Sequence, residues 1–350
     1  MSLEHLAQYK NKTVLVTGGA GAIGSNLTRA LAQAGAAKVI VLDNLVSAER
    51  WNIPSLPNVL FVEGDILDEI KLKRVFFEEP EYIFHLAAFF ANQNSVDHPE
   101  KDLAVNGMGT LKLLEYATIA KDNIKRFVYA SSGCSIYGSN APLPLKEEFM
   151  SMHLTTPYQI TKMLGELYCN FFHHHYNVPV VKARFFNSYG PGEIPGQYRN
   201  VIPNFIYWAL KGMPLPITGT GEETRDFTYV GDIVDGLLRA GVVDAAIGEE
   251  FNLASGVETK IGDLAKLVNS IVGNKAEIKF SEVRKWDTKK RLRASIDKAQ
   301  GLIGYDPNTK FEDGLQAAIK WFKDNWDKIE SAASFGPGVS SAVRSIVVKE

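Results

Sequence analysis

The fold of this chain is decided near its start, by the stretch Val14-Leu15-Val16-Thr17-Gly18-Gly19-Ala20-Gly21-Ala22-Ile23-Gly24. Its apolar beginning predicts a buried strand at Thr13–Thr17, and the residues after Gly21 predict a helix. Gly18 permits a tight turn, Gly21 permits close approach of a pyrophosphate, and Gly24 permits the helix to pack on the strand. The spacing therefore indicates a dinucleotide-binding turn.

The helix that opens at Ala22 and Ile23 would offer free backbone N–H groups and a partial positive charge to an anion. A glycine pattern also occurs in ordinary turns, so its place between a strand and a helix is what gives it weight. The second expected strand, Lys38–Asp43, ends in an acid that can bind an adenosine ribose and would repel a 2′-phosphate. This favours NAD over NADP, although Arg50 lies close in sequence.

Three further residues are placed to meet the adenosine. Asn44 follows Asp43 directly, and Asp65 and Ile66 come after the third expected strand, Val59–Val62. Taken alone, the segment that contains Asp65 would indicate only a turn.

The first half alternates short strands rich in Val, Ile and Phe with helices such as Ile23–Ala34 and Leu103–Ala120. Strands without polar alternation are typical of a parallel sheet covered on both faces. The fold class is therefore α/β, with a Rossmann-type doubly wound parallel sheet and a smaller, interleaved C-terminal substrate-binding lobe. We expect a nucleotide-binding domain over residues 12–185, a mainly substrate-binding lobe over 186–330 with some strands returning to the main sheet, and a poorly ordered tail over 331–350.

Composition excludes several classes of protein. Of 350 residues, 45% are hydrophobic and 22% charged, and the formal net charge of −2 gives no reason to expect nucleic acid or an anionic membrane as a partner. Two cysteines cannot form a disulfide framework, and no apolar run is long enough to span a bilayer. The first residues lack a secretion-type apolar core, so we expect a reduced, cytoplasmic protein.

A second motif predicts acid–base chemistry. Thr156 can cap a helix that Pro157 begins, which places Tyr158 and Lys162 four residues apart on one face. A neighbouring ammonium favours the phenolate and lowers the pKa of the phenol. Such a pair is common on exposed helices, and it indicates a general base only because a dinucleotide turn lies in the same chain.

The ordered set of motifs resembles the extended short-chain dehydrogenase/reductases, and among them the nucleotide-sugar epimerases and dehydratases, with UDP-glucose 4-epimerase as the nearest well-known type. The resemblance covers roughly residues 12–325. It is carried by the glycine turn and Tyr158 with Lys162, and by His85-Leu86-Ala87-Ala88, Asn106-Gly107-Met108-Gly109-Thr110, Ser131-Ser132 through Tyr137-Gly138, Arg184-Phe185-Phe186-Asn187 and Arg225-Asp226-Phe227.

The resemblance implies roles for residues outside those two motifs. The cofactor would be lined or fixed by Leu86, Ala87, Ala88, Asn106, Ser131 and Phe186. The diphosphate and nucleoside of the substrate would be held by Asn187, Asn200, Val201, Arg225 and Arg284. A planar bidentate cation suits a diphosphate, which supports the arginines on physical grounds.

The chain departs from the family pattern beside the expected base. The family places a Ser or Thr four residues before its Tyr-Gly pair, where this chain has Gly133. Ser132 and Ser135 are nearby hydroxyls, and we expect Ser135 to substitute because it would share a strand face with that position; a water could also do so. Dehydratases and decarboxylases carry acids just after that hydroxyl, whereas this chain has Cys134, which we interpret as a small buried residue rather than a nucleophile.

These observations predict an NAD-dependent epimerase that inverts C4 of a UDP-sugar through a transient 4-keto intermediate. Tyr158, Lys162 and Ser135 would be its catalytic residues, with no metal. A nucleotide-sugar 4,6-dehydratase or a UDP-glucuronate decarboxylase-like enzyme stays open as an alternative, as does a non-catalytic NAD-binding protein. Asp43 disfavours a reductase that consumes NADPH. The family implies a homodimer through the helices at Leu103–Ala120 and Tyr158–Tyr176.

Overall fold

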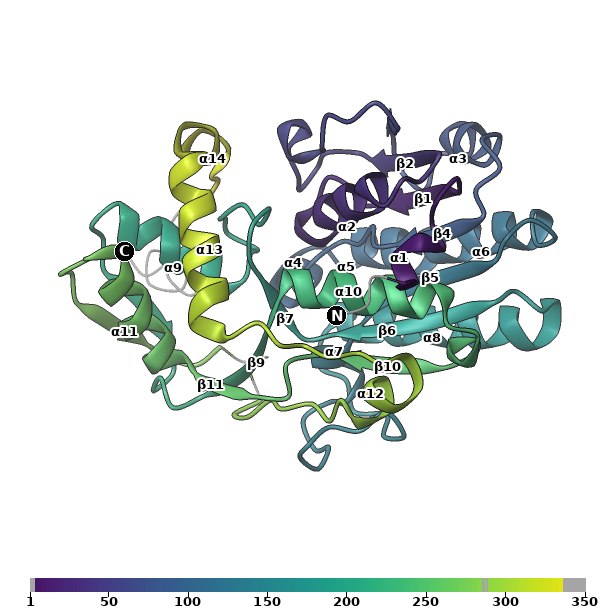
Figure 1. Cartoon of the computed structure of the whole chain (residues 1–350). Coiled ribbons are helices and arrows are strands. Elements are labelled where there is room, and N and C mark those ends of the chain that lie inside the picture. The colour runs from purple at the N-terminus through teal and green to yellow at the C-terminus, as the bar shows by residue number, and fades with distance from the viewer. Residues whose placement is uncertain (1–3, 285–286, 288, 336–350) are drawn as a thin grey trace.

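A computed structural model describes residues 4–284, 287 and 289–335 of the chain. A seven-stranded sheet in the order β10-β6-β5-β4-β1-β2-β3 forms its larger part (Figure 1). All neighbouring strands in it are parallel. The strands are β1 (Thr13–Thr17), β2 (Lys38–Asp43), β3 (Val59–Glu63), β4 (Tyr82–His85), β5 (Arg126–Ser132), β6 (Val180–Phe185) and β10 (Glu250–Leu253). The order reverses direction at β1, which is the point where open sheets of this type bind nucleotides.

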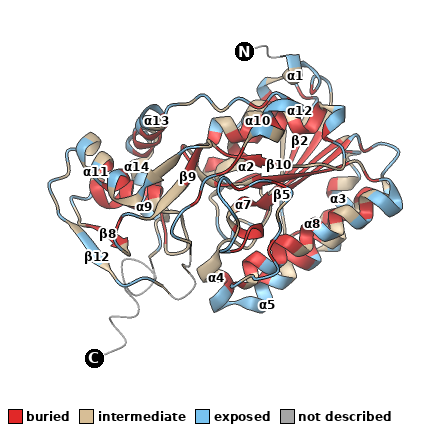
Figure 2. Cartoon of the chain, turned by 90° about the horizontal axis from the view of Figure 1, so that it is seen from below, coloured by how far each residue is buried: buried red, intermediate tan, exposed pale blue. Residues whose placement is uncertain are grey.

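Helices cover both faces of this sheet because its strands are apolar on both sides. On β1, Val14 and Val16 pack into one cluster with Leu27 of α2 (Ala22–Gln33), and α10 (Val230–Val242) lies in the same layer. Leu15 points into the opposite cluster, with residues of α6 (Thr110–Ile119) and α8 (Pro157–Tyr176). The inner faces of α8 and α10 are buried and their outer faces exposed (Figure 2).

The smaller lobe has its own core. It contains a three-stranded sheet, β11-β9-β7, and a parallel pair, β12-β8. These strands are β7 (Asn187–Tyr189), β8 (Leu215–Thr218), β9 (Thr224–Tyr229), β11 (Glu258–Lys260) and β12 (Ile278–Ser281). Against them pack α9 (Val201–Leu210), α11 (Ile261–Val272) and α13 (Phe311–Asp324), through Phe205, Leu264 and Leu315 among others. Since β10 returns to the large sheet after β9, the α/β class and the interleaved lobe are confirmed.

The shorter α-helices of the described residues are α1 (Glu4–Ala7), α3 (Glu69–Phe76), α4 (Asn92–Asp97), α5 (Pro99–Asp102), α7 (Gly133–Ile136), α12 (Asp297–Ile303) and α14 (Trp326–Ala332), and 3₁₀ helices lie at Arg50–Asn52 and Asp244–Ala246. The helix expected over Leu103–Ala120 begins as a π-helical segment, Leu103–Gly109, before α6. None of the helices described is long and apolar enough to cross a membrane.

The expected tail begins later than its composition suggested. Residues 331–335 belong to the packed lobe, since α14 runs to Ala332 and the ring of Phe335 lies 5.4 Å from that of Tyr207. The small residues of this segment gave no indication that the Phe335 side chain packs against the lobe. The rest of the expected tail, 336–350, lies outside the described residues.

Candidate active site

The turn after β1 has the shape of a phosphate cradle. Gly18 has φ +71°, and a Cβ there would lie 2.6 Å from the amide nitrogen of Ala87. A Cβ on Gly24 would lie 2.2 Å from the carbonyl oxygen of Gly18. Gly21 caps α2 without a side-chain hydrogen bond, so no side chain competes for the N–H groups that open the helix at Ala22 and Ile23. The cradle therefore fits the pyrophosphate of a dinucleotide.

Asp43 joins the end of β2 to this turn. Its Oδ2 accepts from the amide of Ala20 and its Oδ1 from that of Leu45, both at 2.9 Å. Burial raises the pKa of the Asp43 carboxyl, which the two amides and the nearby charge of Arg199 oppose. Arg50, which could have favoured a 2′-phosphate, lies over the ring of Phe61 instead.

The remaining adenosine candidates surround the same end of the sheet. Asn44 donates to the Asp65 carboxylate at 2.7 Å, which ties the loops after β2 and β3 together. Ile66 is buried against Gly109, where a Cβ would lie 2.4 Å from its Cδ1.

The loop after β4 is fastened to β1 and to α8. Leu86 donates to the carbonyl of Thr17 at 3.1 Å, and Ala87 and Ala88 continue the half-buried loop beside Gly18. Asn106 accepts from the amide of Phe89 at 2.8 Å and donates to Thr161 at 3.3 Å. One amide side chain thus positions both the loop beside the cofactor turn and the helix that bears the expected base.

Helix α8 carries that base. Thr156 accepts from the amide of Gln159 at 3.3 Å, Pro157 begins the helix, and Tyr158 is buried in its first turn. The Lys162 Nζ lies 5.8 Å from the centre of the Tyr158 ring and donates to the carbonyl of Ala130 at 2.9 Å. The two residues therefore stand together at the end of β5, on the interior side of the helix.

Burial dominates the acid–base properties of this pair. It raises the pKa of the Tyr158 phenol, and a hydrogen bond with Ser132 opposes that rise. Burial also lowers the pKa of Lys162 to about 8. The lowered phenol pKa that the sequence predicted is therefore not found in the protein alone, where burial is the largest cause of the rise and the charge of Asp102 adds to it.

The hydroxyl beside Tyr158 belongs to Ser132. Strand β5 ends at Ser132 and Gly133 opens α7, so the expectation that Ser135 shares a strand face with position 133 is wrong. Ser135 instead donates to the Ser132 hydroxyl at 2.9 Å. A Cβ on Gly133 would lie 2.1 Å from Cε2 of Phe186, so the Phe186 ring occupies the space of the family's usual side chain.

The expected diphosphate arginines converge on one carboxylate. Arg225 donates to Asp287 at 2.9 Å and Arg284 to the other oxygen at 3.1 Å. Arg225 also donates to the carbonyl of Lys289 at 3.2 Å, and the ammonium of Lys289 contacts the carbonyl of Cys134. These contacts bring the arginines to the region of α7.

The other substrate candidates lie at two places. Asn187 is in weak contact with Cys134, at 3.5 Å between Oδ1 and Sγ. Asn200 donates to Glu193 at 2.8 Å, and Val201 begins α9. Burial raises the pKa of the Cys134 thiol to about 11, which agrees with a residue that is not a nucleophile.

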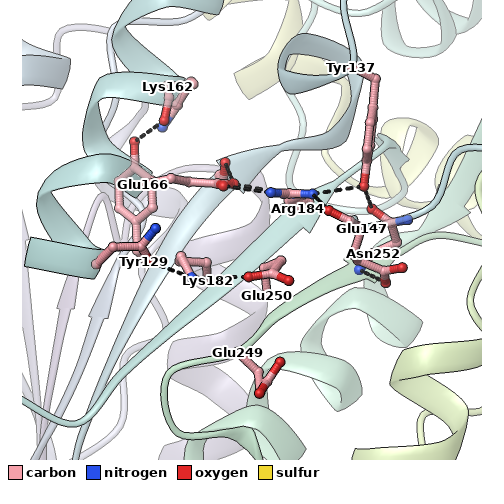
Figure 3. Close-up of polar contacts among 12 residues, drawn as sticks. Tyr129, Tyr137, Glu147, Lys162, Glu166, Lys182, Arg184, Glu249, Glu250 and Asn252 are labelled. Carbon is pink, nitrogen blue, oxygen red and sulfur yellow. Dashed lines mark hydrogen bonds and ion pairs between the residues drawn. The ribbon is translucent and has the colours of Figure 1, made fainter. Parts of the chain in front are cut away.

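A buried ionic network between α8 and β6 was not predicted (Figure 3). Glu166 accepts from Arg184 at 2.9 and 2.8 Å and from the Ser131 hydroxyl at 2.5 Å. Arg184 also donates to the Tyr137 hydroxyl at 3.1 Å. The spacing contained a signal, because Glu166 follows Lys162 by the same four residues that separate Lys162 from Tyr158.

Metal-binding clusters of three or more His, Cys, Asp or Glu do not occur among the described residues. In the run His173-His174-His175, His173 contacts the carbonyl of Val178 at 2.9 Å, and His175 stacks on Phe171 with ring centres 5.3 Å apart. His173 and His175 thus contact other residues at the end of α8.

Comparison with known proteins finds relatives over most of the chain. The model of the NAD dependent epimerase/dehydratase family matches residues 14–254. A UDP-glucose 4-epimerase of Mycolicibacterium smegmatis is 34% identical over 313 residues, which are 89% of this chain and 98% of that protein. The solved structure of the epimerase Mth375 of Methanothermobacter thermautotrophicus is 56% identical, with a TM-score of 0.94, and covers 95% of this chain and 98% of that one. The enzyme WbmF of Bordetella bronchiseptica, solved with NAD+ and UDP, is 39% identical with a TM-score of 0.82, over 93% and 96% of the two chains.

Proposed function

Because the chain belongs to the NAD-dependent epimerase/dehydratase family, we propose that it inverts C4 of a UDP-sugar. One observation carries the proposal: Tyr158, Ser132 and Lys162 lie together at the end of β5, in the same sheet as the strand that precedes the dinucleotide turn. A phenol next to a hydroxyl and an ammonium can remove and return a proton on a sugar hydroxyl.

Side chains of this chain would remove and return that proton. NAD, when bound, accepts and returns a hydride at the same carbon. Tyr158 would take the proton of the C4 hydroxyl, and Ser132 would donate a hydrogen bond to the oxygen that develops negative charge. Lys162 would favour the phenolate through its charge. Ser135 would act one step further back, through its hydrogen bond to Ser132.

Elimination chemistry is disfavoured by the composition of α7. The helix reads Gly133-Cys134-Ser135-Ile136 and has no carboxyl group to donate a proton to a departing hydroxyl. Tyr158 and Lys162 are both present, which disfavours a protein that only binds NAD.

We assign the nucleotide diphosphate to Arg225 and Arg284. Their guanidinium groups share Asp287, and two converging forks can bind the two phosphates bidentately. Asn187, Asn200 and Val201 are the proposed contacts to the rest of the substrate. The bound UDP in the structure of WbmF supports a uridine nucleotide.

A homodimer is proposed through α8 and the π-helical segment. Large apolar side chains are exposed on these neighbouring elements: Leu103, Met108, Ile160, Leu167 and Phe171 are each about half exposed. Light scattering during size-exclusion chromatography would give the molar mass, and a monomer at micromolar concentration would contradict this assignment.

The reaction is tested by product analysis. Purified protein is incubated separately with UDP-glucose, UDP-N-acetylglucosamine and UDP-glucuronate, and products are separated and weighed by mass spectrometry. An epimer has the mass of its substrate, whereas a dehydratase or decarboxylase product has lost water or carbon dioxide. Tyr158→Phe is the control, which should bind NAD and form no product. Absence of a C4 epimer from every nucleotide sugar would contradict the proposal.

A further inference from the structure

Residues 190–200, which connect β7 to α9, lie directly on the dinucleotide turn. Asn26 of α2 donates to the carbonyls of Ala22 and Pro191, both at 2.8 Å. Asn52 donates to the carbonyls of Ala20 and Gly192, both at 2.9 Å. Two amide side chains from the nucleotide-binding half therefore bridge the turn and this segment.

The far end of the segment is fixed by the smaller lobe. Gly196 donates to Asn204 of α9 at 2.9 Å and accepts from the same side chain at 3.0 Å. Gln197 donates to the carbonyl of Ser334 at 2.9 Å. The backbone that carries Arg199 is thus held by both halves of the molecule, and the Arg199 side chain is half-buried.

The guanidinium of Arg199 lies over the cofactor turn. It contacts the carbonyl of Ser47, in the loop after β2, and lines one small cavity together with Gly21 and Ala22. Its charge acts on two carboxyl groups, Asp43 and Glu193. The cation is therefore near both the acid at the end of β2 and the start of α2.

Neither carboxyl group neutralises this cation by direct pairing. Within the described part of the chain, Arg199 has no ion pair within 4.0 Å. Asp43 is bonded to the amides of Ala20 and Leu45, and Glu193 to the side chain of Asn200. Burial raises the pKa of Glu193 to about 7 and lowers that of Arg199. An anion next to the guanidinium would therefore offset the energetic cost of burying its charge.

We propose that Arg199 binds the pyrophosphate of NAD and that residues 190–200 clamp the dinucleotide onto its turn. A guanidinium fork matches phosphate oxygens, and the helix N-terminus would bind the same anion from the opposite side. A 2′-phosphate is the other phosphate that a dinucleotide could present, and Asp43 disfavours it at this place.

The clamp also links the two binding sites. Arg199 faces the cofactor, and the adjacent Asn200, a proposed substrate contact, is bonded to Glu193 of the same segment. A segment held in this way would keep NAD bound while sugars enter and leave.

The test measures binding without any sugar, so it does not depend on the proposed reaction. Wild type, Arg199→Ala, Arg199→Lys and the control Arg29→Ala, an exposed arginine of α2, are purified identically. NAD retained per chain is determined by mass spectrometry, and the dissociation constants of NAD, ADP-ribose and adenosine are measured by calorimetry. We expect Arg199→Ala to bind NAD and ADP-ribose about 10- to 100-fold more weakly, with Arg199→Lys between it and wild type. Adenosine affinity, which involves no phosphate, should be the same in all four proteins.

Other results would overturn the proposal. Unchanged NAD content and affinity in Arg199→Ala would show that the guanidinium does not touch the cofactor. An equal loss for adenosine and ADP-ribose would show a structural role alone. NADP is titrated alongside the other three ligands, and a loss of affinity confined to NADP would move the contact to a 2′-phosphate. Should Arg199→Ala fail to fold, Arg199→Lys provides the same comparison, because an ammonium retains the charge and loses the fork.

Discussion

Gly133 and the ring of Phe186 are in such close contact that a Cβ on Gly133 would lie 2.1 Å from Phe186 Cε2. The position that carries a hydroxyl in similar families is therefore closed by an aromatic ring. In the proposed mechanism the hydrogen-bonding role beside Tyr158 therefore falls to Ser132, and this assignment has consequences that can be measured.

Restoring a serine at position 133 should harm this protein. Gly133→Ser would force Phe186 out of place, and overpacking of this kind costs about 1–3 kcal/mol of unfolding free energy. Denaturant titration measures the loss, and the added substitution Phe186→Ala should remove part of the clash. Gly301→Ser, at a helical glycine whose Cβ would meet nothing within 4 Å, is the matched control. A Gly133→Ser variant as stable as the control would contradict the role given to the Phe186 ring.

The two serines should differ in their effect on catalysis. Ser132→Ala removes the hydroxyl bonded to Tyr158 and should lower kcat on the order of 100-fold. Ser135→Ala removes only the group behind it and should have a much smaller effect. Initial rates at saturating substrate measure both, and the reverse order would return the primary role to Ser135.

Activity should stop rising in alkaline solution. Because burial raises the pKa of Tyr158, kcat/KM should first increase with pH as the phenolate fraction grows. Above the Lys162 pKa of about 8, the ammonium that favours the phenolate is lost, which cancels this gain, so kcat/KM should level off near pH 8.

Variants assign this levelling to one residue. Lys162→Arg keeps a cation that does not titrate in this range, so its kcat/KM should continue to rise above pH 8 while some activity is kept. Lys289, whose pKa is also lowered to about 8, is the control, and Lys289→Arg should leave the levelling in place. If the levelling instead disappears in Lys289→Arg, Lys162 is not its source.

The buried pair behind the site should be costly to break. Glu166→Gln would leave Arg184 without its carboxylate partner at a site where both side chains are only 2% exposed. Losing one member of such a pair costs about 3–5 kcal/mol of unfolding free energy. The exposed pair Lys320–Asp324 on α13 is the control, and Asp324→Asn should change stability very little. Equal effects of the two substitutions would mean that burial does not govern the pair.

The elements that depend on local pattern were predicted well. The glycine turn and the spacing of Tyr158 and Lys162 are local features, and strand periodicity is sufficient to expect a parallel sheet. Ser132 was passed over because the choice between two hydroxyls depends on where β5 ends and α7 begins, which differs by a residue or two from any pattern-based boundary.

Contacts between distant segments could not be predicted in this way. Arg199 lies far along the chain from Asp43 and Ser47, and Arg184 lies far from Tyr137. No sequence spacing therefore predicts these contacts. The resemblance to the family predicts only the site residues that its members share. It does not predict contacts that depend on the loop conformations of this chain.

The return of β10 to the large sheet also bears on how the chain can be divided. Cutting after β6 would uncover the long edge of that strand and remove Asn252, whose amide donates to Glu147 and whose side chain accepts from Tyr137. An unpaired parallel edge is a template for self-association. A fragment that ends at residue 185 should therefore precipitate instead of behaving as a portable cofactor module, and exchange of the C-terminal half between relatives would have to carry β10 with it.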